Sequence, residues 1–276
     1  ILSLLYKAEA HDVRLILPLY AQVDRAAYGV APVEGFGDLP LEFGGHRFRW
    51  SLHSAPLPRS GARAWFIDIP GLFARPTLYT GDADEHLRFI ALTRAALELC
   101  QRWGWAPQVL HCNDWHTAFA PLLLQTAYAW DRLFDGVRTV MTIHNIGYQG
   151  VFGAAQGGDL GIGPGDFARL HQDDLRAGRI NALKHGVLYA DAVTTVSPTY
   201  AQEIMTPEYG LGLEGVLRQR AAQVWGILNG VDYDDWDPRH DRWLPRHFDA
   251  DSLATKAALK HELMQRLRLE RRADTA

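Results

Sequence analysis

The chain has 276 residues, of which 47% are hydrophobic and 22% charged, proportions ordinary for one large globular domain or two small ones. Its formal net charge of -4 provides no basic field, so we expect neither nucleic acid nor an anionic membrane as a partner. No stretch reaches the roughly 18 apolar residues of a membrane span. Two cysteines, Cys100 and Cys112, are too few for a disulfide framework, which predicts a reducing, cytoplasmic setting.

Short apolar runs bounded by turn residues predict strands in the first quarter of the chain. Val13 to Pro18 is a compact apolar run that predicts a buried parallel strand. Apolar and polar residues alternate from Leu41 to Leu52 on either side of Gly44-Gly45, which is typical of a hairpin. Ala64 to Ile69 predicts another strand, ended by Pro70-Gly71. We expect the segment between these elements to be an excursion outside the central sheet.

Apolar side chains spaced four residues apart predict the first long helix. Asp82 or Asp84 caps this helix, the spacing continues from Leu87 to Trp103, and Gly104 stops it. Two further helices are predicted, one from Thr117 to Tyr128 and one from about Ile180 to Tyr189.

Strands alternate with these helices in the rest of the chain. They are predicted at Val109-Leu110, Val137 to Ile143, Ala192 to Val196 and Val224 to Leu228. Ser197-Pro198 opens a further helix as its cap and first-turn proline. This alternating order with short turns predicts an α/β fold with a doubly wound parallel sheet.

Polar, ring-bearing side chains follow two of the predicted strands at the point where each strand stops. His111 to Thr117 follows the first strand, and Thr142 to Phe152 follows the second. In an open α/β sheet the carboxyl ends of the strands form the edge where ligands bind. The two clusters are rich in partners for hydroxyl groups and contain no nucleophile in an elbow motif, so they suit a sugar better than an ester. The candidate residues are Asp114, His116, His144, Asn145, Tyr148 and Gln149.

Three features leave alternatives open. The His111 to His116 cluster provides half of a hydrolytic metal site, but no clear thiolate or carboxylate set follows it, which makes a metal hydrolase the weaker hypothesis. The glycines of Gly210 to Gly215 predict either an anion-binding loop at a helix start or a plain loop. Tyr79 is either a stacking platform for a sugar ring or a half-buried core residue.

Five motifs, in order and at regular spacing, carry a resemblance to a known family. They are Asp114-Trp115-His116-Thr117, Thr142 to Gly150, Ala190-Asp191 with Thr194 to Ala201, Tyr209-Gly210 with Gly212 to Gly215, and Gly226 to Asp232. Together these motifs resemble bacterial glycogen synthase and plant starch synthase, the ADP-glucose-dependent glycosyltransferases of family 5. The resemblance covers nearly the whole chain, from His11 to the tail helix.

The resemblance implies a GT-B fold of two Rossmann-like domains, of which this chain is the amino-terminal, acceptor-side one. It implies that the full enzyme transfers glucose from ADP-glucose to the non-reducing end of an α-1,4-glucan, with retention of configuration and without a cofactor or metal. In such enzymes the histidine matching His144 lies against the donor glucose and Asn145 follows it. Positions matching Asp114 and Tyr79 contact glucose or the acceptor, and Asn229 sits at the domain hinge. The implied catalytic residues are His144 and Asp114, and the implied substrate-binding residues are Tyr79, Asn145, His116, Tyr148, Gln149 and Asn229.

The same resemblance predicts the domain organisation. Residues 1–233 form the acceptor-side domain without its first strand, because Ile1 already matches the helix behind that strand. In the strand order 3-2-1-4 the strand at Val13 to Leu17 then lacks its central neighbour. Residues 234–276 form a polar, proline-broken linker and an entry helix, from Ser252 to Leu269, to a carboxyl-terminal nucleotide-binding domain. The family's Lys-x-Gly-Gly-Leu phosphate loop is absent from the sequence, so we expect the chain alone to be inactive. The alternative is a non-catalytic glucan-binding domain.

Overall fold

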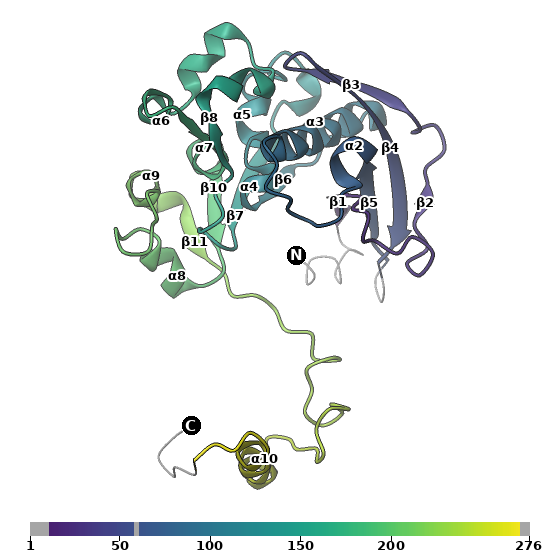
Figure 1. Cartoon of the computed structure of the whole chain (residues 1–276), viewed down its shortest axis with the longest axis vertical. Helices are drawn as coiled ribbons and strands as arrows, with labels where there is room; N and C mark the ends of the chain where they lie inside the picture. The colour runs from purple at the N-terminus through teal and green to yellow at the C-terminus, as the bar shows by residue number, and fades with distance from the viewer. Residues whose placement is uncertain (1–10, 58–60, 271–276) are drawn as a thin grey trace. The chain divides into compact units, whose positions relative to one another are not determined.

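The computed structural model describes residues 11–57 and 61–270, and the chain divides into two compact units, Ile1–Leu228 and Asn229–Ala276. Figure 1 labels the elements. The strands are β1 (Arg14–Pro18), β2 (Ala31–Pro32), β3 (Leu39–Phe43), β4 (His46–Pro56), β5 (Arg63–Asp68), β6 (Val109–Asn113), β7 (Arg138–Ile143), β8 (Val151–Gly153), β9 (Arg179–Asn181), β10 (Ala192–Thr195) and β11 (Val224–Gly226). The α-helices are α2 (Pro70–Phe73), α3 (Glu85–Trp103), α4 (Asp114–Thr117), α5 (Ala120–Leu124), α6 (Gln172–Arg176), α7 (Ala182–Tyr189), α8 (Pro198–Glu203), α9 (Glu214–Gln219) and α10 (Leu253–Arg266). Short 3-10 helices are η2 (Arg132–Phe134), η3 (Ala154–Leu160), η4 (Pro164–Arg169) and η5 (Ala221–Gln223).

The strands of the first unit form two larger sheets and one small one. The first sheet has the order β1-β5-β4-β2, with β3 paired to β4, and the second has the order β11-β10-β7-β6. All four strands of the second sheet run parallel, as the alternating strand and helix order predicts. β8 and β9 pair separately as an antiparallel ribbon. This confirms the α/β prediction, although the strands are divided between sheets.

The hairpin prediction is confirmed, but its predicted place outside the central sheet is wrong. β3 and β4 pair across Gly44 and Gly45, whose φ values of 56° and 81° suit glycine in a tight turn. β4 also pairs antiparallel with β5, which pairs parallel with β1, so the hairpin extends the sheet that contains β1. Alternating hydrophobicity shows which face of a strand is buried and leaves its hydrogen-bonding neighbour undefined.

β1 and β6 are edge strands of their sheets among the described residues. β1 pairs there only with β5, and β6 only with β7. The predicted order 3-2-1-4 places one more strand beside β1, and that placement stays a prediction.

Helix α3 has the ends that the sequence predicts. Asp84 precedes it, and Gly104 ends it in the left-handed conformation at φ 58°. The Asp84 carboxylate binds Arg75 in place of the helix amides, with Nη2 and Oδ2 2.6 Å apart. α3 packs against β1, β3 and β5 and against α4 (Figure 1). One hydrophobic core joins it to both larger sheets, and its members include Trp50, Ile67, Ile90, Met141 and Val193, each at most 1% exposed.

The single helix predicted from Thr117 to Tyr128 is wrong. α4 already begins at Asp114, and a break at Ala118 and Phe119 separates it from α5. Pro121 explains the break, because its nitrogen carries no hydrogen to donate to the carbonyl of Thr117 four residues earlier.

Helices α7 and α8 agree more closely with the sequence. α7 begins at Ala182, two residues later than predicted, because Asn181 caps it by accepting a hydrogen bond from the Lys184 amide at 3.0 Å. Ser197 caps α8 in the same way, accepting from the amide of Tyr200 at 2.9 Å.

The second unit consists of an irregular stretch followed by α10. The predicted helix from Ser252 to Leu269 is present, shorter at each end, and every residue of α10 is at least partly exposed. None of the helices in residues 11–57 and 61–270 is both long and apolar enough to cross a membrane.

Candidate functional site

Asp114 joins the ends of two neighbouring parallel strands. It directly follows β6 and adopts a φ of 53°, a left-handed conformation that Asp and Asn tolerate better than most other residues. Its Oδ1 accepts hydrogen bonds from the backbone nitrogens of His144 at 2.8 Å and Asn145 at 3.5 Å, just after β7. The carboxylate therefore holds the second loop, and it caps neither α4, in which Asp114 is the first residue, nor α5.

The side chains of His144 and Asn145 lie at the surface beside this bond. Nε2 of His144 is 3.0 Å from Oδ1 of Asn113, and the imidazole is exposed. Oδ1 of Asn145 accepts a hydrogen bond from the amide of Gly147 at 2.9 Å, which closes a tight turn after the strand. The two clusters that the sequence predicts at one sheet edge are thus in direct contact.

Tyr79 is brought to this edge from the loop between α2 and α3. Its hydroxyl lies 2.8 Å from Nε2 of His116, and the two ring centroids are 5.7 Å apart. Tyr79 is 52% exposed, so it belongs to the surface and the core alternative is wrong. Burial lowers the pKa of His116 to about 4 and raises the pKa of Tyr79. The pair is therefore neutral at pH 7.

A cavity of about 350 Å³ lies between Tyr79 and the loop after β7. Tyr148, 62% exposed, lines it on the loop side, and the indole of Trp115 lines it from α4. The loop passes so close to the indole that a Cβ on Gly150 would lie 2.2 Å from Cε3 of Trp115. Only glycine fits there, and its φ of 61° adds to that requirement. A small concave site with two exposed phenol rings is suited to a sugar ring.

Gln149 lines the same cavity but directs its amide to other parts of the protein. Its Nε2 donates to the carbonyls of Ile146 and Leu211, each at 3.1 Å, and its Oε1 accepts from Asn181 at 2.6 Å. Gln149 thereby attaches the loop after β7 to the glycine-rich stretch at 210–215. In that stretch the amide of Gly212 donates to the carboxylate of Glu214 at 2.9 Å, so the chain's own acid occupies the amide that an anion would use.

The structure thus brings seven of the eight predicted site residues together, and Asn229 lies in the second unit. Among the described residues, no three His, Cys, Asp or Glu side chains are placed to hold a metal ion together. Both cysteines are free and buried. Sequence reasoning did not select Asn113 or Trp115, although both stand inside the cluster from His111 to Thr117, and it missed Glu85 and Arg88, which bind the Tyr79 loop from α3.

Comparison with known families places this geometry in context. Residues 2–219 match the model of the starch synthase catalytic domain. The chain belongs to this family.

Relatives of known name agree with that assignment. Glycogen synthase 1 of Geobacter metallireducens is 39% identical over 268 residues, which are 96% of this chain and 53% of the relative. A glycogen synthase of Streptococcus equi subsp. equi is 41% identical over 267 residues, which are 96% of this chain and 54% of the relative. The chain therefore spans about half the length of the curated relatives it matches.

A solved structure confirms the fold. The catalytic domain of starch synthase IV from Arabidopsis thaliana, bound to ADP and acarbose, superposes with a TM-score of 0.79 at 33% identity. The match covers 99% of this chain and 55% of that one. The Rossmann-like fold of a GT-B glycosyltransferase, predicted from the five motifs, is confirmed.

Proposed function

We propose that the whole protein transfers glucose from ADP-glucose to the non-reducing end of an α-1,4-glucan with retention of configuration. One observation carries this proposal beyond family membership. The Asp114 carboxylate bonds the His144 amide at 2.8 Å, and this contact sets hydroxyl-binding side chains beside a cavity of about 350 Å³ at the ligand edge of a parallel sheet. The relatives support it as glycogen synthases, and the matching starch synthase IV structure holds ADP and acarbose.

Within this function we assign catalytic roles to His144 and Asp114. The exposed His144 ring and the carbonyl of the same residue would contact the donor glucose, and the Asp114 carboxylate would place negative charge near it. Retaining glycosyl transfer develops positive charge on the sugar, and preorganised oxygen atoms stabilise that charge. No cofactor or metal is part of this proposal.

The remaining residues would bind substrate. Tyr79 and Tyr148 offer exposed phenol faces on which a glucose ring can stack, and His116 holds the Tyr79 hydroxyl at 2.8 Å. Asn145 would bind sugar hydroxyls from the turn after β7. Gln149 would act through the loop that it attaches. Asn229 would serve at the domain hinge.

The domain organisation is part of the same proposal. Residues 1–233 would form the acceptor-side domain, and residues 234–276 would form the linker and entry helix to a nucleotide-binding domain. The partners would be ADP-glucose and an α-1,4-glucan, and the location would be the cytoplasm, where the two free cysteines stay reduced.

The test is transfer of radiolabelled glucose from ADP-glucose to glycogen by the whole protein that carries this sequence. We expect the wild type to transfer glucose to glycogen and Asp114→Ala to transfer none. A folded whole protein that binds glycogen and transfers no glucose from ADP-glucose would instead indicate the non-catalytic glucan-binding alternative.

A further inference from the structure

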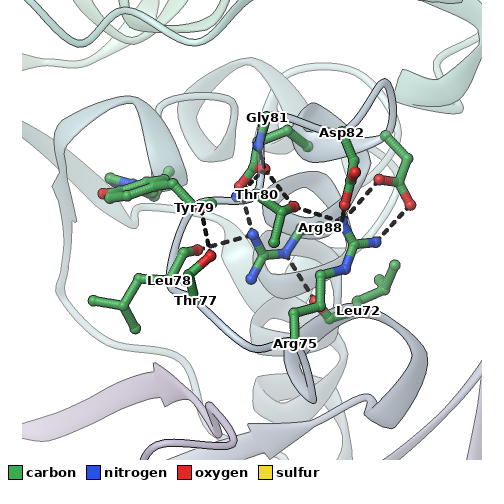
Figure 2. A network of polar contacts seen from close by, with 12 residues as sticks. Leu72, Arg75, Thr77, Leu78, Tyr79, Thr80, Gly81, Asp82 and Arg88 are labelled. Carbon is green, nitrogen blue, oxygen red and sulfur yellow. Dashed lines mark hydrogen bonds and ion pairs between the residues drawn. The ribbon is translucent and has the colours of Figure 1, made fainter.

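Arg88 is a fully buried arginine beneath the loop that carries Tyr79. The loop connects α2 to α3, and Arg88 lies in the first turn of α3 with 0% of its surface exposed. Its Nε donates to the carbonyl of Leu72 at 2.8 Å, and its Nη1 donates to the carbonyl of Leu78 at 2.9 Å (Figure 2). One guanidinium therefore fixes a carbonyl of α2, that of Leu72, and the carbonyl of Leu78, the residue directly before Tyr79.

Glu85 completes the attachment on the other side of Tyr79. Its Oε1 lies 2.5 Å from Nη1 of Arg88, which neutralises the buried charge. Its Oε2 accepts from the backbone nitrogens of Thr80 and Gly81, each at 3.1 Å. The backbone is thus held immediately before and immediately after Tyr79 by a single ion pair.

Three more contacts hold the same loop. Thr77 Oγ1 donates to the Tyr79 carbonyl at 2.7 Å, and Arg75 bonds Asp82 at 3.0 Å and Asp84 at 2.6 Å (Figure 2). Figure 2 shows the Tyr79 ring pointing away from both arginines, so the polar network binds the backbone and leaves the phenol face open. Among the described residues, the Tyr79 hydroxyl has one hydrogen-bond partner, Nε2 of His116.

This arrangement is more than the loop needs for stability alone. A buried ion pair contributes little net stability, because desolvating two charges offsets most of their attraction. A binding site gains from it, because an aromatic ring fixed before the ligand arrives does not lose freedom on binding. Arginine suits the task because its planar fork bonds several acceptors in fixed directions, which a lysine ammonium cannot do.

We propose that Arg88 and Glu85 are a positioning pair that holds Tyr79 as a preorganised platform for the acceptor glucan. This inference rests on the proposed function and concerns acceptor affinity. It predicts that disturbing the pair raises the KM for the acceptor while the KM for ADP-glucose and kcat change little, since Arg88 is fully buried and the Glu85 side chain, 18% exposed, is engaged by Arg88 and by the loop amides.

The test compares Arg88→Lys with a matched control on the same helix. Arg94 is also buried, at 6% exposure, and also binds loop carbonyls, those of Leu160 and Gly161, away from Tyr79. We expect Arg88→Lys to raise the KM for maltoheptaose roughly tenfold, the equivalent of one strong hydrogen bond. Arg94→Lys should lower Tm to a similar extent and leave that KM unchanged. Equal Tm losses with unchanged acceptor KM in both variants would overturn the proposal.

A second variant and a double mutant show whether the pair acts through Tyr79. The double variant combines Arg88→Lys with Tyr79→Ala. Because Arg88 and Tyr79 would act as one unit, its acceptor KM should not exceed that of Tyr79→Ala alone. Additive effects would contradict the proposal. If Arg88→Lys does not fold, Glu85→Gln replaces it, because it removes the ion pair and keeps the side-chain volume.

Amide hydrogen exchange tests the attachment independently of activity. We expect the amides of Thr80 and Gly81 to be protected in the wild type and to exchange faster in Glu85→Gln. Protection unchanged in Glu85→Gln would overturn the positioning role. An inactive wild type with protected amides would overturn the proposed function and not the attachment of the loop.

Discussion

Oδ1 of Asp114 accepts a hydrogen bond from the backbone nitrogen of His144 at 2.8 Å, although 30 residues separate them in the chain. The bond connects the first residues after two parallel strands, β6 and β7, whose carboxyl ends lie side by side. The position of the exposed His144 ring thus depends on an acid that is itself held in a left-handed backbone conformation. Changes at Asp114 should therefore affect both the loop and the chemistry.

Asp114→Asn and Asp114→Ala should separate the charge from the geometry. Asparagine keeps an acceptor oxygen and tolerates positive φ, so we expect reduced glucosyl transfer with little change in Tm. Alanine loses the acceptor and strains the backbone, which should lower the free energy of unfolding by about 2 kcal/mol and abolish transfer. Asp131→Asn is the control, since Asp131 also accepts a backbone hydrogen bond, from Leu133 at 2.9 Å, away from the site. Full transfer by Asp114→Ala would exclude Asp114 from the site.

His144→Ala should lower kcat more than it weakens glucan binding. Contacts to the reacting sugar strengthen in the transition state, whereas acceptor binding depends on other residues. Because the ring is exposed and bonds only Asn113 among its described partners, we expect Tm to stay within a degree or two of the wild type. The measurement is steady-state transfer at varied acceptor concentration. A wild-type kcat with a raised acceptor KM would assign His144 to acceptor binding.

Gly150→Ala should damage the site by overpacking. The new Cβ would lie 2.2 Å from Trp115, and φ at this position is 61°. Backbone strain of roughly 1 to 2 kcal/mol and overpacking of roughly 1 to 3 kcal/mol should both appear in the free energy of unfolding. Gly136→Ala is the matched control, because its φ is 82° and nothing lies within 4 Å of the new Cβ. It should show the backbone strain alone, so equal losses in the two variants would argue against a tight contact with the indole.

His185 should make the protein less stable in acid. Its Nδ1 hydrogen is donated to the carbonyl of Asn181 at 2.7 Å and its Nε2 accepts from the amide of His171 at 3.1 Å, so the folded state needs a neutral ring. Burial lowers its pKa to about 4. The unfolded chain, with a histidine pKa of about 6.5, binds the proton first, so the contribution of His185 to the free energy of unfolding is constant above pH 6.5 and falls between pH 6.5 and 4.

Between pH 6.5 and pH 4 we expect His185 to lower the free energy of unfolding by about 3 kcal/mol. Urea unfolding at several pH values measures this change. His185→Gln should flatten part of the slope of the free energy of unfolding against pH. The other histidines whose pKa burial lowers, His116, His53 and His111, should keep a slope in the variant. His11→Gln, at an exposed histidine, is the control and should leave the slope as in the wild type. An identical slope in His185→Gln would exclude His185 as its source.

The sequence predicts those parts of the fold whose signals are local. Gly104 ends α3 and Ser197 caps α8 where predicted, because a left-handed glycine and a side-chain cap act within one helical turn. The break near Pro121 is also a local effect, but the apolar run around that proline favours a continuous helix. Which strands pair with β4 depends on packing between distant segments, and alternation along β4 carries no such information.

The candidate site follows the same division. The clusters around Asp114 and His144 are predictable because each follows a strand, and parallel strands deliver both to one edge. Arg88 is not predictable in this way. It stands between Leu87 and Phe89 in an apolar helix, and this sequence context does not indicate that it binds the carbonyl of Leu78. Asp84 shows the same limit, since its sequence position predicts a cap and its carboxylate binds Arg75.

The contacts that fix the Tyr79 loop join residues that are close together in the sequence. Arg88 reaches Leu78 across 10 residues and Glu85 reaches Thr80 across 5, whereas Tyr79 reaches His116 across 37. Closing short loops loses less chain entropy than closing long ones, so local contacts form early in folding. Synthesis also proceeds from the amino end. We therefore expect the loop to acquire its shape on the ribosome while β7 and His144 are still unsynthesised, so that the later strands assemble against a surface that already exists.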